Sequence, residues 1–150
     1  MRRVLLGLYT YVEFFGISLL VVPLFAFVAL VHRDNDPGRR LRGRMMRRYG
    51  RWTSSLTPLW RFTWRGTAPA DVGSRAYVVV ANHESTSDPF LLSHLPWDMR
   101  WIAKEEIFKL PLIGFLMRCG GDIPLRRGSK ESVVTMLAEA RRTLDAGVPV

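Results

Sequence analysis

The stretch from Tyr77 to Phe90 reads YVVVANHESTSDPF, and it decides how we interpret the fold. Residues 77–81 form a short, continuous apolar run, which is typical of a strand covered on both faces of a sheet. Asn82 and His83 follow this run at once, at the carboxyl end, where ligands bind in open α/β sheets. The sequence therefore predicts a buried strand that carries polar side chains to a binding edge.

Asp88 follows His83 by five positions, and the pair admits two interpretations. In the first, a turn folds the carboxylate back onto one imidazole nitrogen, which fixes the tautomer and leaves the other nitrogen as a general base. In the second, Asp88 only caps a helix over residues 90–95, with Pro89 at its first position, and His83 is a polar loop residue. The dipeptide Asp88–Pro89 suits both interpretations.

Alternating strands and helices are expected after a linker at residues 66–74. Ser129 is a plausible N-cap for the last helix, and Gly147 suits the position just after its end. This alternation predicts an α/β fold with a mixed, partly parallel sheet and covering helices. The further strands are expected at residues 100–103, 122–125 and 148–150, and the helices at 104–110, 111–118 and 130–146.

Other kinds of chemistry find little support in the sequence. A nucleophilic role for Ser85 or Ser87 is not favoured, because no Gly-x-Ser-x-Gly elbow is present. Three scattered histidines and one cysteine give no metal-ligand spacing, so we expect no metal. The lone Cys119 excludes an intramolecular disulfide framework and is best interpreted as a small buried apolar residue.

The N-terminal part is apolar, and a basic stretch follows it. Residues 4–31 contain a single charge, Glu13, whereas residues 33–65 contain ten arginines against two aspartates. Residues 14–31 alone would span about 27 Å as a helix, enough to just cross a bilayer. The alternative is a bent helix or helix pair in one leaflet, broken at Gly16 or Pro23. The run is too long for a usual secretory signal.

The basic stretch predicts where the chain lies. Arginines 33–51 place their side of the membrane in the cytoplasm, so we expect the cell membrane with the folded domain on the cytoplasmic side. Residues 39–51 are followed by aromatic and leucine side chains, including Trp52, Leu59 and Trp64. This mixture favours a helix at the lipid interface, with membrane lipids as partners, over a nucleic-acid partner. The alternative is that these arginines only set the orientation of the chain in the membrane and bind no lipid headgroups.

Two blocks of sequence resemble the glycerolipid acyltransferases of the 1-acyl-glycerol-3-phosphate acyltransferase type. The first block, Asn82-His83-x-x-x-x-Asp88, resembles the first motif of that family. The second resembles the segment that leads into the second motif and the motif itself. The second block consists of Lys104-Glu105-Glu106-Ile107, Pro111, Gly114 and Gly121-Asp122-Ile123-Pro124-Leu125-Arg126-Arg127. Together the resemblance covers residues 75–150.

The resemblance implies a reaction and its residues. His83 would deprotonate the hydroxyl of 1-acyl-sn-glycerol-3-phosphate and Asp88 would orient the imidazole, giving phosphatidic acid from acyl-CoA or acyl-carrier protein without a cofactor. Arg127 matches the phosphate-binding arginine, whereas Arg126 stands where relatives often carry an acidic residue. Another lysophospholipid or glycolipid acceptor, or a non-catalytic lipid-binding protein, remains an alternative. The resemblance also implies that Gly121 belongs to the phosphate site and that Asn82, Lys104 and Glu105 support the two motifs.

The third motif of this family, usually Phe-Pro-Glu-Gly-Thr-Arg, does not occur in the 150 residues. We therefore interpret residues 1–65 as a membrane-associated and basic juxtamembrane region and residues 66–150 as the N-terminal part of an acyltransferase domain. Residues 148–150 look like the strand that would lead into the third motif. On this interpretation the 150-residue chain alone is expected to have little acyltransferase activity.

Overall fold

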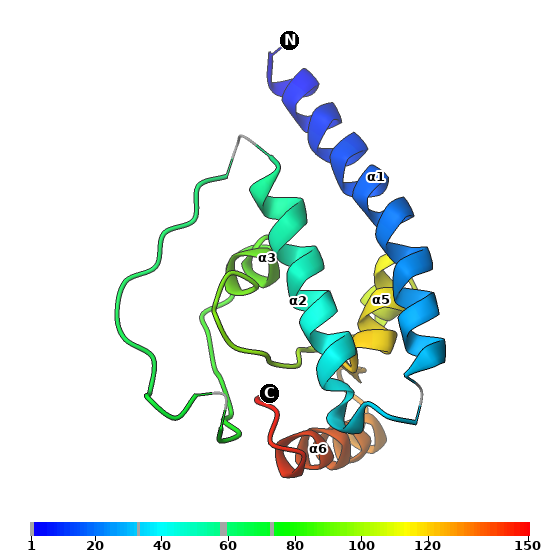
Figure 1. The fold of residues 1–150 in the computed structure, drawn as a ribbon, viewed down its shortest axis with the longest axis vertical. Coiled ribbons are helices and arrows are strands. Elements are labelled where there is room, and N and C mark those ends of the chain that lie inside the picture. The colour runs from blue at the N-terminus through cyan, green and yellow to red at the C-terminus, as the bar shows by residue number, and fades with distance from the viewer. Residues whose placement is uncertain (1, 33, 58–59, 73) are drawn as a thin grey trace.

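The computed structural model describes residues 2–32, 34–57, 60–72 and 74–150. Arg33 and Leu59, which belong to the basic and aromatic stretch of the sequence, lie outside the described residues. The described chain combines helices with a small parallel sheet, and the N-terminal end of one long helix projects from the rest (Figure 1).

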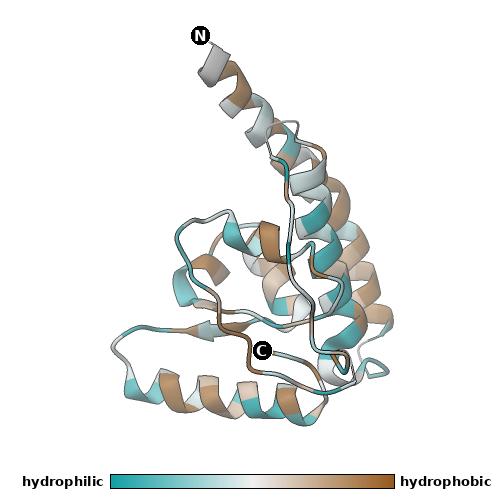
Figure 2. Cartoon of the chain, turned by 90° about the vertical axis from the view of Figure 1, so that its left-hand side faces the viewer, coloured by the Kyte–Doolittle hydropathy of each residue, from teal (hydrophilic) through white to brown (hydrophobic). Residues whose placement is uncertain are grey.

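Helix α1 is a single apolar helix spanning Arg2–Val31. Its 30 residues correspond to about 45 Å. Of the two alternatives, a single helix and a helix broken at Gly16 or Pro23, the structure shows the single helix, which runs through both residues. Val21 and Phe25 flank Pro23 and are buried in the core, and this packing holds the helix together although proline donates no backbone hydrogen bond. Within it, Val4–Val31 is long and apolar enough to cross a membrane, and most of this stretch is exposed (Figure 2).

Helix α2 spans Arg40–Ser55 and packs against α1, α3 and α5 (Figure 1). A short 3-10 turn at Pro37–Arg39 precedes it. The carboxylate of Asp36 accepts hydrogen bonds from the first backbone amides of α2, those of Leu41 at 2.9 Å and Arg42 at 3.2 Å. These bonds satisfy donors that a helix start otherwise leaves unpaired, and they fix where α2 begins.

The sheet is built from parallel segments. Strand β1, Ile102–Lys104, pairs with β2, Ile123–Leu125, in the register that sets Ile102 opposite Ile123. These strands confirm the predictions at residues 100–103 and 122–125 to within two residues. The predicted strand at residues 148–150 lies beside β1, because the Arg100 amide donates to the Pro149 carbonyl at 2.8 Å.

The strand predicted at residues 77–81 is not a regular strand in the structure, although residues 77–79 are hydrogen-bonded to residues 148–150, which lie beside β1. The amide of Val150 donates to the Tyr77 carbonyl at 2.9 Å, and the amide of Val79 donates to the Val150 carbonyl at 2.7 Å. Val150 thus bonds to Tyr77 and Val79, which are two positions apart in the sequence. This is the hydrogen-bond pattern of parallel strands. The resulting order is residues 77–79, residues 148–150, β1 and β2.

The prediction that residues 77–81 are covered on both faces is wrong. The side chains of Val78 and Val80 are 70% and 89% exposed, and the segment lies at the outer edge of the sheet. The apolar run favoured burial because strands of parallel sheets are usually covered by helices. Here α1, α3 and α5 pack against α2 instead.

The predicted helices around the sheet exist with shifted ends. They are α3 at Asp88–Leu92, α4 at Glu105–Phe108, α5 at Ile113–Gly120 and α6 at Lys130–Asp145. The ends of α6 confirm both predicted signals: the Ser129 side chain accepts from the Ser132 amide at 3.2 Å, and Gly147 follows the helix with φ +73. Lys104, predicted to open a helix, instead ends β1.

The main core cluster forms where α1, α2, α4 and α5 meet. Tyr49 and Leu116 are fully buried there. The Tyr49 hydroxyl and the Ser18 hydroxyl lie 2.7 Å apart, so the polar groups that α1 and α2 bury satisfy each other. Cys119 is only partly buried against this cluster, in agreement with an apolar packing role. The buried members of the cluster are Val21, Phe25, Met46, Tyr49, Phe108, Leu116 and Met117.

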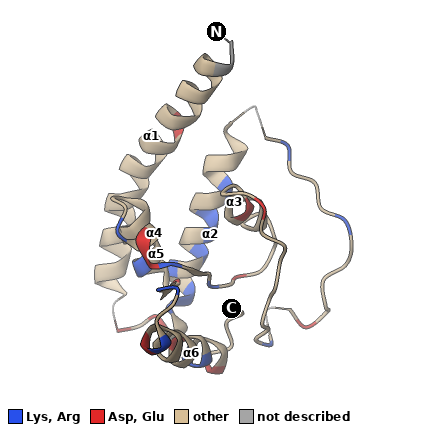
Figure 3. Ribbon diagram, turned by 180° about the vertical axis from the view of Figure 1, so that it is seen from behind, with Lys and Arg blue, Asp and Glu red and all other residues tan. Residues whose placement is uncertain are grey.

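Basic residues occur along the length of α2 (Figure 3), and most of their side chains bind the protein itself. Arg40 donates to the Ala146 carbonyl at 2.7 Å, and Arg51 donates to the His94 carbonyl at 3.3 Å. These side chains therefore have acceptors inside the fold, and the interfacial helix whose arginines reach lipid headgroups stays a prediction. Arg42, paired with Asp36, and Arg47, paired with Asp122, also have acceptors inside the fold, whereas Arg44 and Arg48 are exposed.

Candidate functional site: a histidine–aspartate pair at the sheet edge

His83 and Asp88 are in direct contact. The turn at residues 82–88 brings Asp88 Oδ2 to 2.8 Å from His83 Nδ1. The same oxygen accepts from the backbone amides of Glu84 and Ser85, each at 2.9 Å. The turn predicted from the sequence is confirmed, and the cap-only interpretation of Asp88 is wrong. Asp88 is itself the first residue of α3, and the N-cap position is occupied by Ser87, which makes no side-chain cap bond.

The hydrogen bonds to Asp88 determine its charge. The amide of Ser85 is the main cause that lowers the pKa of this carboxyl, and the amide of Glu84 and the ring of His83 add to it, against an opposing effect of desolvation. An ionised carboxylate only accepts hydrogen bonds, so Nδ1 of His83 must carry the proton. The unprotonated nitrogen of the neutral ring is then Nε2, and the His83 side chain is 68% exposed.

The serines of the turn support its shape. The hydroxyls of Ser85 and Ser87 lie 2.8 Å apart, and the Ser87 amide donates to Ser85 Oγ at 3.2 Å. In the described part of the chain neither hydroxyl is hydrogen-bonded to His83. This arrangement agrees with the sequence interpretation that neither serine is a nucleophile, and it leaves the imidazole free for an incoming hydroxyl. Asn82 is exposed beside His83.

Gly121 lies at the end of α5, where the backbone is left-handed with φ +87. A Cβ there would lie 3.0 Å from Arg39 Cδ and 3.2 Å from Arg100 Nε. The glycine is therefore explained by its backbone conformation and by close packing. This explanation is separate from the phosphate role that the resemblance implies.

The other predicted site residues follow the carboxyl ends of β1 and β2. Arg127 is exposed in the loop after β2. Arg126 donates to Ser129 Oγ at 3.3 Å, so its guanidinium is held against the start of α6. Lys104 ends β1, and Glu105 opens α4.

The order of the strands places His83 and Arg127 on the two outer segments of the sheet. Three strand spacings separate these segments, which corresponds to about 14 Å. Both side chains follow carboxyl ends, and a long arginine reaches across part of this separation. The structure thus brings His83 and Asp88 into contact and leaves Arg127 exposed in the loop after β2.

Sequence reasoning missed a buried ion pair at the amino end of β2. Arg47 Nη2 lies 3.3 Å from Asp122 Oδ1, and this oxygen also accepts from the Trp101 amide at 2.9 Å. Burial raises the pKa of the Asp122 carboxyl, and the nearby guanidinium of Arg47 opposes this shift. An aspartate at the start of an apolar strand was the only signal in the sequence, because its partner lies 75 positions away.

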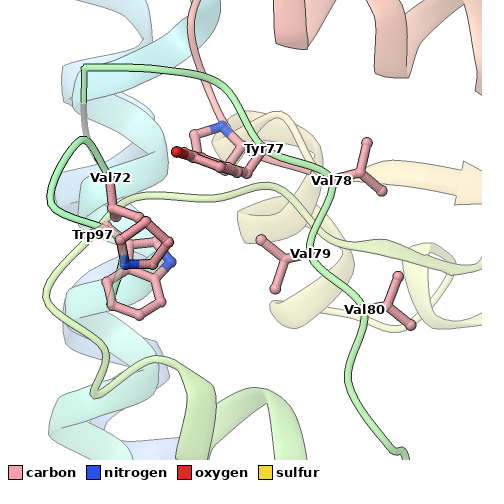
Figure 4. A pocket seen from close by; sticks show the side chains of 8 residues that line it. Val72, Tyr77, Val78, Val79, Val80 and Trp97 are labelled. Atoms are coloured by element: carbon pink, nitrogen blue, oxygen red, sulfur yellow. The ribbon is translucent and has the colours of Figure 1, made fainter. Parts of the chain in front are cut away.

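An apolar pocket of about 280 Å³ lies along the segment that leads to His83 (Figure 4). Tyr77 and Val79 point to one side of the extended chain and Val78 and Val80 to the other. The pocket lies beside residues 77–80, which precede the turn at residues 82–88. Its remaining lining comes from Pro69, Val72, Trp97 and Pro149.

Comparison with known proteins shows which protein family the chain belongs to. The family model described as Acyltransferase matches residues 61–150, so the chain belongs to the Acyltransferase family. The matched range includes the turn that joins His83 to Asp88 and the loop with Arg127.

Individual relatives narrow the resemblance. A 1-acyl-sn-glycerol-3-phosphate acyltransferase of Chlamydomonas reinhardtii is 31% identical over 153 residues, covering 99% of this chain and 46% of the relative. A chloroplastic 1-acyl-sn-glycerol-3-phosphate acyltransferase of Arabidopsis thaliana is 31% identical over 100 residues, covering 66% and 28%. The enzyme of that name from Helicobacter pylori is 31% identical over 81 residues, covering 53% and 33%. The chain thus spans less than half the length of these relatives, and no solved structure matches it significantly.

Proposed function

We propose that the protein transfers a fatty acyl group from an acyl thioester to the free hydroxyl of 1-acyl-sn-glycerol-3-phosphate, giving phosphatidic acid. The observation that carries this proposal is the 2.8 Å contact between His83 Nδ1 and Asp88 Oδ2, with the imidazole exposed at the sheet edge. Family membership and the names of three relatives support the reaction class and the acceptor.

In the proposed mechanism, His83 Nε2 takes the proton of the acceptor hydroxyl while Asp88 holds Nδ1–H and stabilises the imidazolium. The hydroxyl oxygen attacks the carbonyl carbon of the thioester and forms the new C–O bond. The C–S bond then breaks, and the leaving sulfur takes the proton from His83. General-base catalysis supplies about 10²–10⁴-fold, so positioning and oxyanion stabilisation supply the rest.

The acceptor phosphate is assigned to Arg127, whose planar guanidinium suits a phosphate monoester. The exposed position of Arg127 in the loop after β2 supports this assignment. Gly121 contributes by shaping the end of α5, and Arg126 contributes positive charge from the start of α6. Asn82, Lys104 and Glu105 form the supporting shell of the site.

The acyl donor is acyl-CoA or acyl-carrier protein, and we place the enzyme at the cell membrane with the sheet edge on the cytoplasmic side. The length and apolar character of Val4–Val31 support membrane attachment. The arginine-rich stretch after it supports the cytoplasmic assignment. A membrane location also suits an acceptor that resides in the bilayer.

Acyl transfer by the full-length protein in membranes tests the proposal. Labelled acyl thioester and lysophosphatidic acid should give labelled phosphatidic acid, and His83→Gln should lower the rate about 10²–10⁴-fold. His32→Gln, at the end of α1, is a matched control that should leave the rate unchanged. Wild-type rates in His83→Gln would reject His83 as the base.

A second arm tests the assignment of the phosphate. Arg127→Gln should raise the KM for lysophosphatidic acid and leave the KM for monoacylglycerol, which lacks a phosphate, unchanged. Arg141→Gln removes a solvent-exposed arginine of α6 and serves as the control. If both acceptors are affected equally, the phosphate assignment is wrong.

A further inference from the structure

Helix α2 carries a line of arginines on one face. Arg44, Arg47, Arg48 and Arg51 are spaced at three and four positions, which places them on successive turns of the same side. No acidic residue occurs within Arg40–Ser55. Like charges at these spacings repel each other and destabilise a helix. The repulsion is relieved only by partners from outside α2.

The fold supplies such partners unequally. Arg47 is paired with Asp122, and Arg51 donates to the carbonyls of His94 and Leu95 at 3.3 and 3.4 Å. Those carbonyls carry no full charge, so the charge of Arg51 is not neutralised. Arg44 and Arg48 are exposed and have no hydrogen bond to the part of the chain that the structure describes. Three positive charges therefore remain uncompensated on this face.

These arginines line a hollow rather than a flat surface. The hollow has a volume of about 140 Å³ and lies between α2 and the loop at residues 95–98. That volume is roughly four to five times the share of one water molecule in liquid water. It suits a phosphate group rather than a whole nucleotide or a protein segment. Its lining is Arg44, Arg47, Arg48, Arg51, Leu95, Pro96, Trp97 and Asp98.

Arg47 lines the hollow but its guanidinium is turned inward. It is only 7% exposed, its Nη2 is paired with Asp122, and its guanidinium carbon lies 4.9 Å from the centre of the Trp101 ring. Arg47 therefore adds positive charge beneath the hollow, and the hydrogen bonds to an anion must come from the exposed arginines. The one carboxylate in the lining, Asp98, is engaged by Arg100 at 2.7 Å.

The hollow is separate from the His83–Asp88 pair. Residues 95–98 precede β1 and lie at the amino end of the parallel sheet, whereas His83 follows a carboxyl end. The six extended residues from Tyr77 to Asn82 alone cover about 16 Å, at about 3.3 Å for each of five steps. Tyr49 packs α2 against α1. Measured around the axis of α2, Arg44, Arg48 and Arg51 lie 100° or more away from Tyr49. This orientation favours a soluble ligand over lipids around α1.

We propose that this hollow is an anion site that binds the phosphate group of a soluble ligand between α2 and the loop at residues 95–98. Arg44 and Arg48 supply exposed guanidinium forks, Arg51 adds charge, and the buried guanidinium of Arg47 adds positive charge from beneath. Guanidinium groups bind phosphate through paired, charge-assisted hydrogen bonds. The inference does not depend on the proposed acyltransferase reaction.

Titration calorimetry of the full-length protein in a neutral detergent, with pyrophosphate as the probe, tests the site. Arg44→Gln/Arg48→Gln should weaken pyrophosphate binding by at least about tenfold, the equivalent of one charge-assisted hydrogen bond. Arg61→Gln/Arg65→Gln removes the same charge from exposed positions outside the hollow and should change binding less than twofold. Equal weakening in both pairs, or no binding to the wild type, would overturn the proposal.

Two further measurements separate the alternatives. Without ligand, the Tm of Arg44→Gln/Arg48→Gln should stay the same or rise, because repulsion is relieved; a fall would make these arginines structural and overturn the site. Vesicles of phosphatidylcholine with one part in five phosphatidylglycerol should bind both double variants equally. Selective loss of vesicle binding, or of acyl-carrier-protein binding, without any pyrophosphate binding would assign the surface to lipid or to protein instead.

Discussion

Two of the contacts between a basic side chain and a carboxylate in this protein, His83–Asp88 and Arg47–Asp122, differ in almost every respect. His83 and Asp88 are five positions apart on an exposed turn, with 68% of the His83 side chain accessible. Arg47 and Asp122 are 75 positions apart, and the side chains are 9% and 1% exposed. The first pair leaves a ring nitrogen for a substrate, whereas the second joins α2 to the start of β2.

The difference shows how one kind of contact serves two purposes. Asp88 accepts from two backbone amides of its own turn, so the geometry of the exposed pair is set locally and needs little of the fold. Asp122 accepts from the Trp101 amide and from Arg47, so it ties a strand, a helix and a neighbouring strand together. We therefore expect mutations in the buried pair to affect stability, and those in the exposed pair to affect chemistry.

Arg47→Ala should give the largest loss of stability. Removing the guanidinium leaves Asp122 buried without its charge partner, which costs about 3–5 kcal/mol. Urea denaturation followed by circular dichroism measures this loss. Arg48→Ala, the neighbouring exposed arginine, is the matched control and should be close to neutral. Equal effects of the two changes would show that the buried pair does not carry stability.

Gly43→Ala should destabilise the protein less, by about 1–3 kcal/mol. A methyl group at Gly43 meets the guanidinium of Arg100, which is buried and donates to the Arg39 carbonyl at 2.8 Å. Gly7→Ala lies in open space on α1 and should be neutral or slightly stabilising. Denaturation midpoints of the two variants compare them directly, and a neutral Gly43→Ala would mean that Arg100 moves aside at no cost.

Replacing both members of the buried pair should cost less than removing one. Arg47→Met/Asp122→Leu keeps much of the volume and leaves no buried charge, so we expect it to recover most of the loss seen in Arg47→Ala. A double-mutant cycle with the single variants measures the coupling. If the double variant is as unstable as Arg47→Ala, Asp122 is held mainly by other contacts.

The smallest effect is expected in the titration of Asp88. Its pKa is lowered from the ordinary value of an aspartate by the Ser85 and Glu84 amides and by His83. A carboxyl with a depressed pKa in the folded state stabilises the fold above its ordinary pKa, and this contribution is lost as the pH falls toward the lowered value. Carbon-detected NMR of the Asp88 side chain follows the titration. An ordinary or raised pKa would mean that the turn is open in solution.

The sequence was most informative where the signal is local. Ser129 and Gly147 marked the ends of α6, and the spacing of His83 and Asp88 marked the turn, because these structures depend on neighbours along the chain. The exposure of Val80 and the partners of Arg47 depend on segments far away in the sequence. Pro23 indicated a break in α1, but burial of Val21 and Phe25 outweighs the one hydrogen bond that proline removes.

The most direct test of the account measures activity and stability together in His83→Gln. Acylation of lysophosphatidic acid by the full-length protein should fall about 10²–10⁴-fold, while the denaturation midpoint stays at the wild-type value. Arg47→Ala, assayed below its own midpoint, should show the reverse pattern of lost stability and retained turnover per folded molecule. Unchanged acylation in His83→Gln, or a loss of activity explained by unfolding, would contradict the assignment of the exposed pair to chemistry.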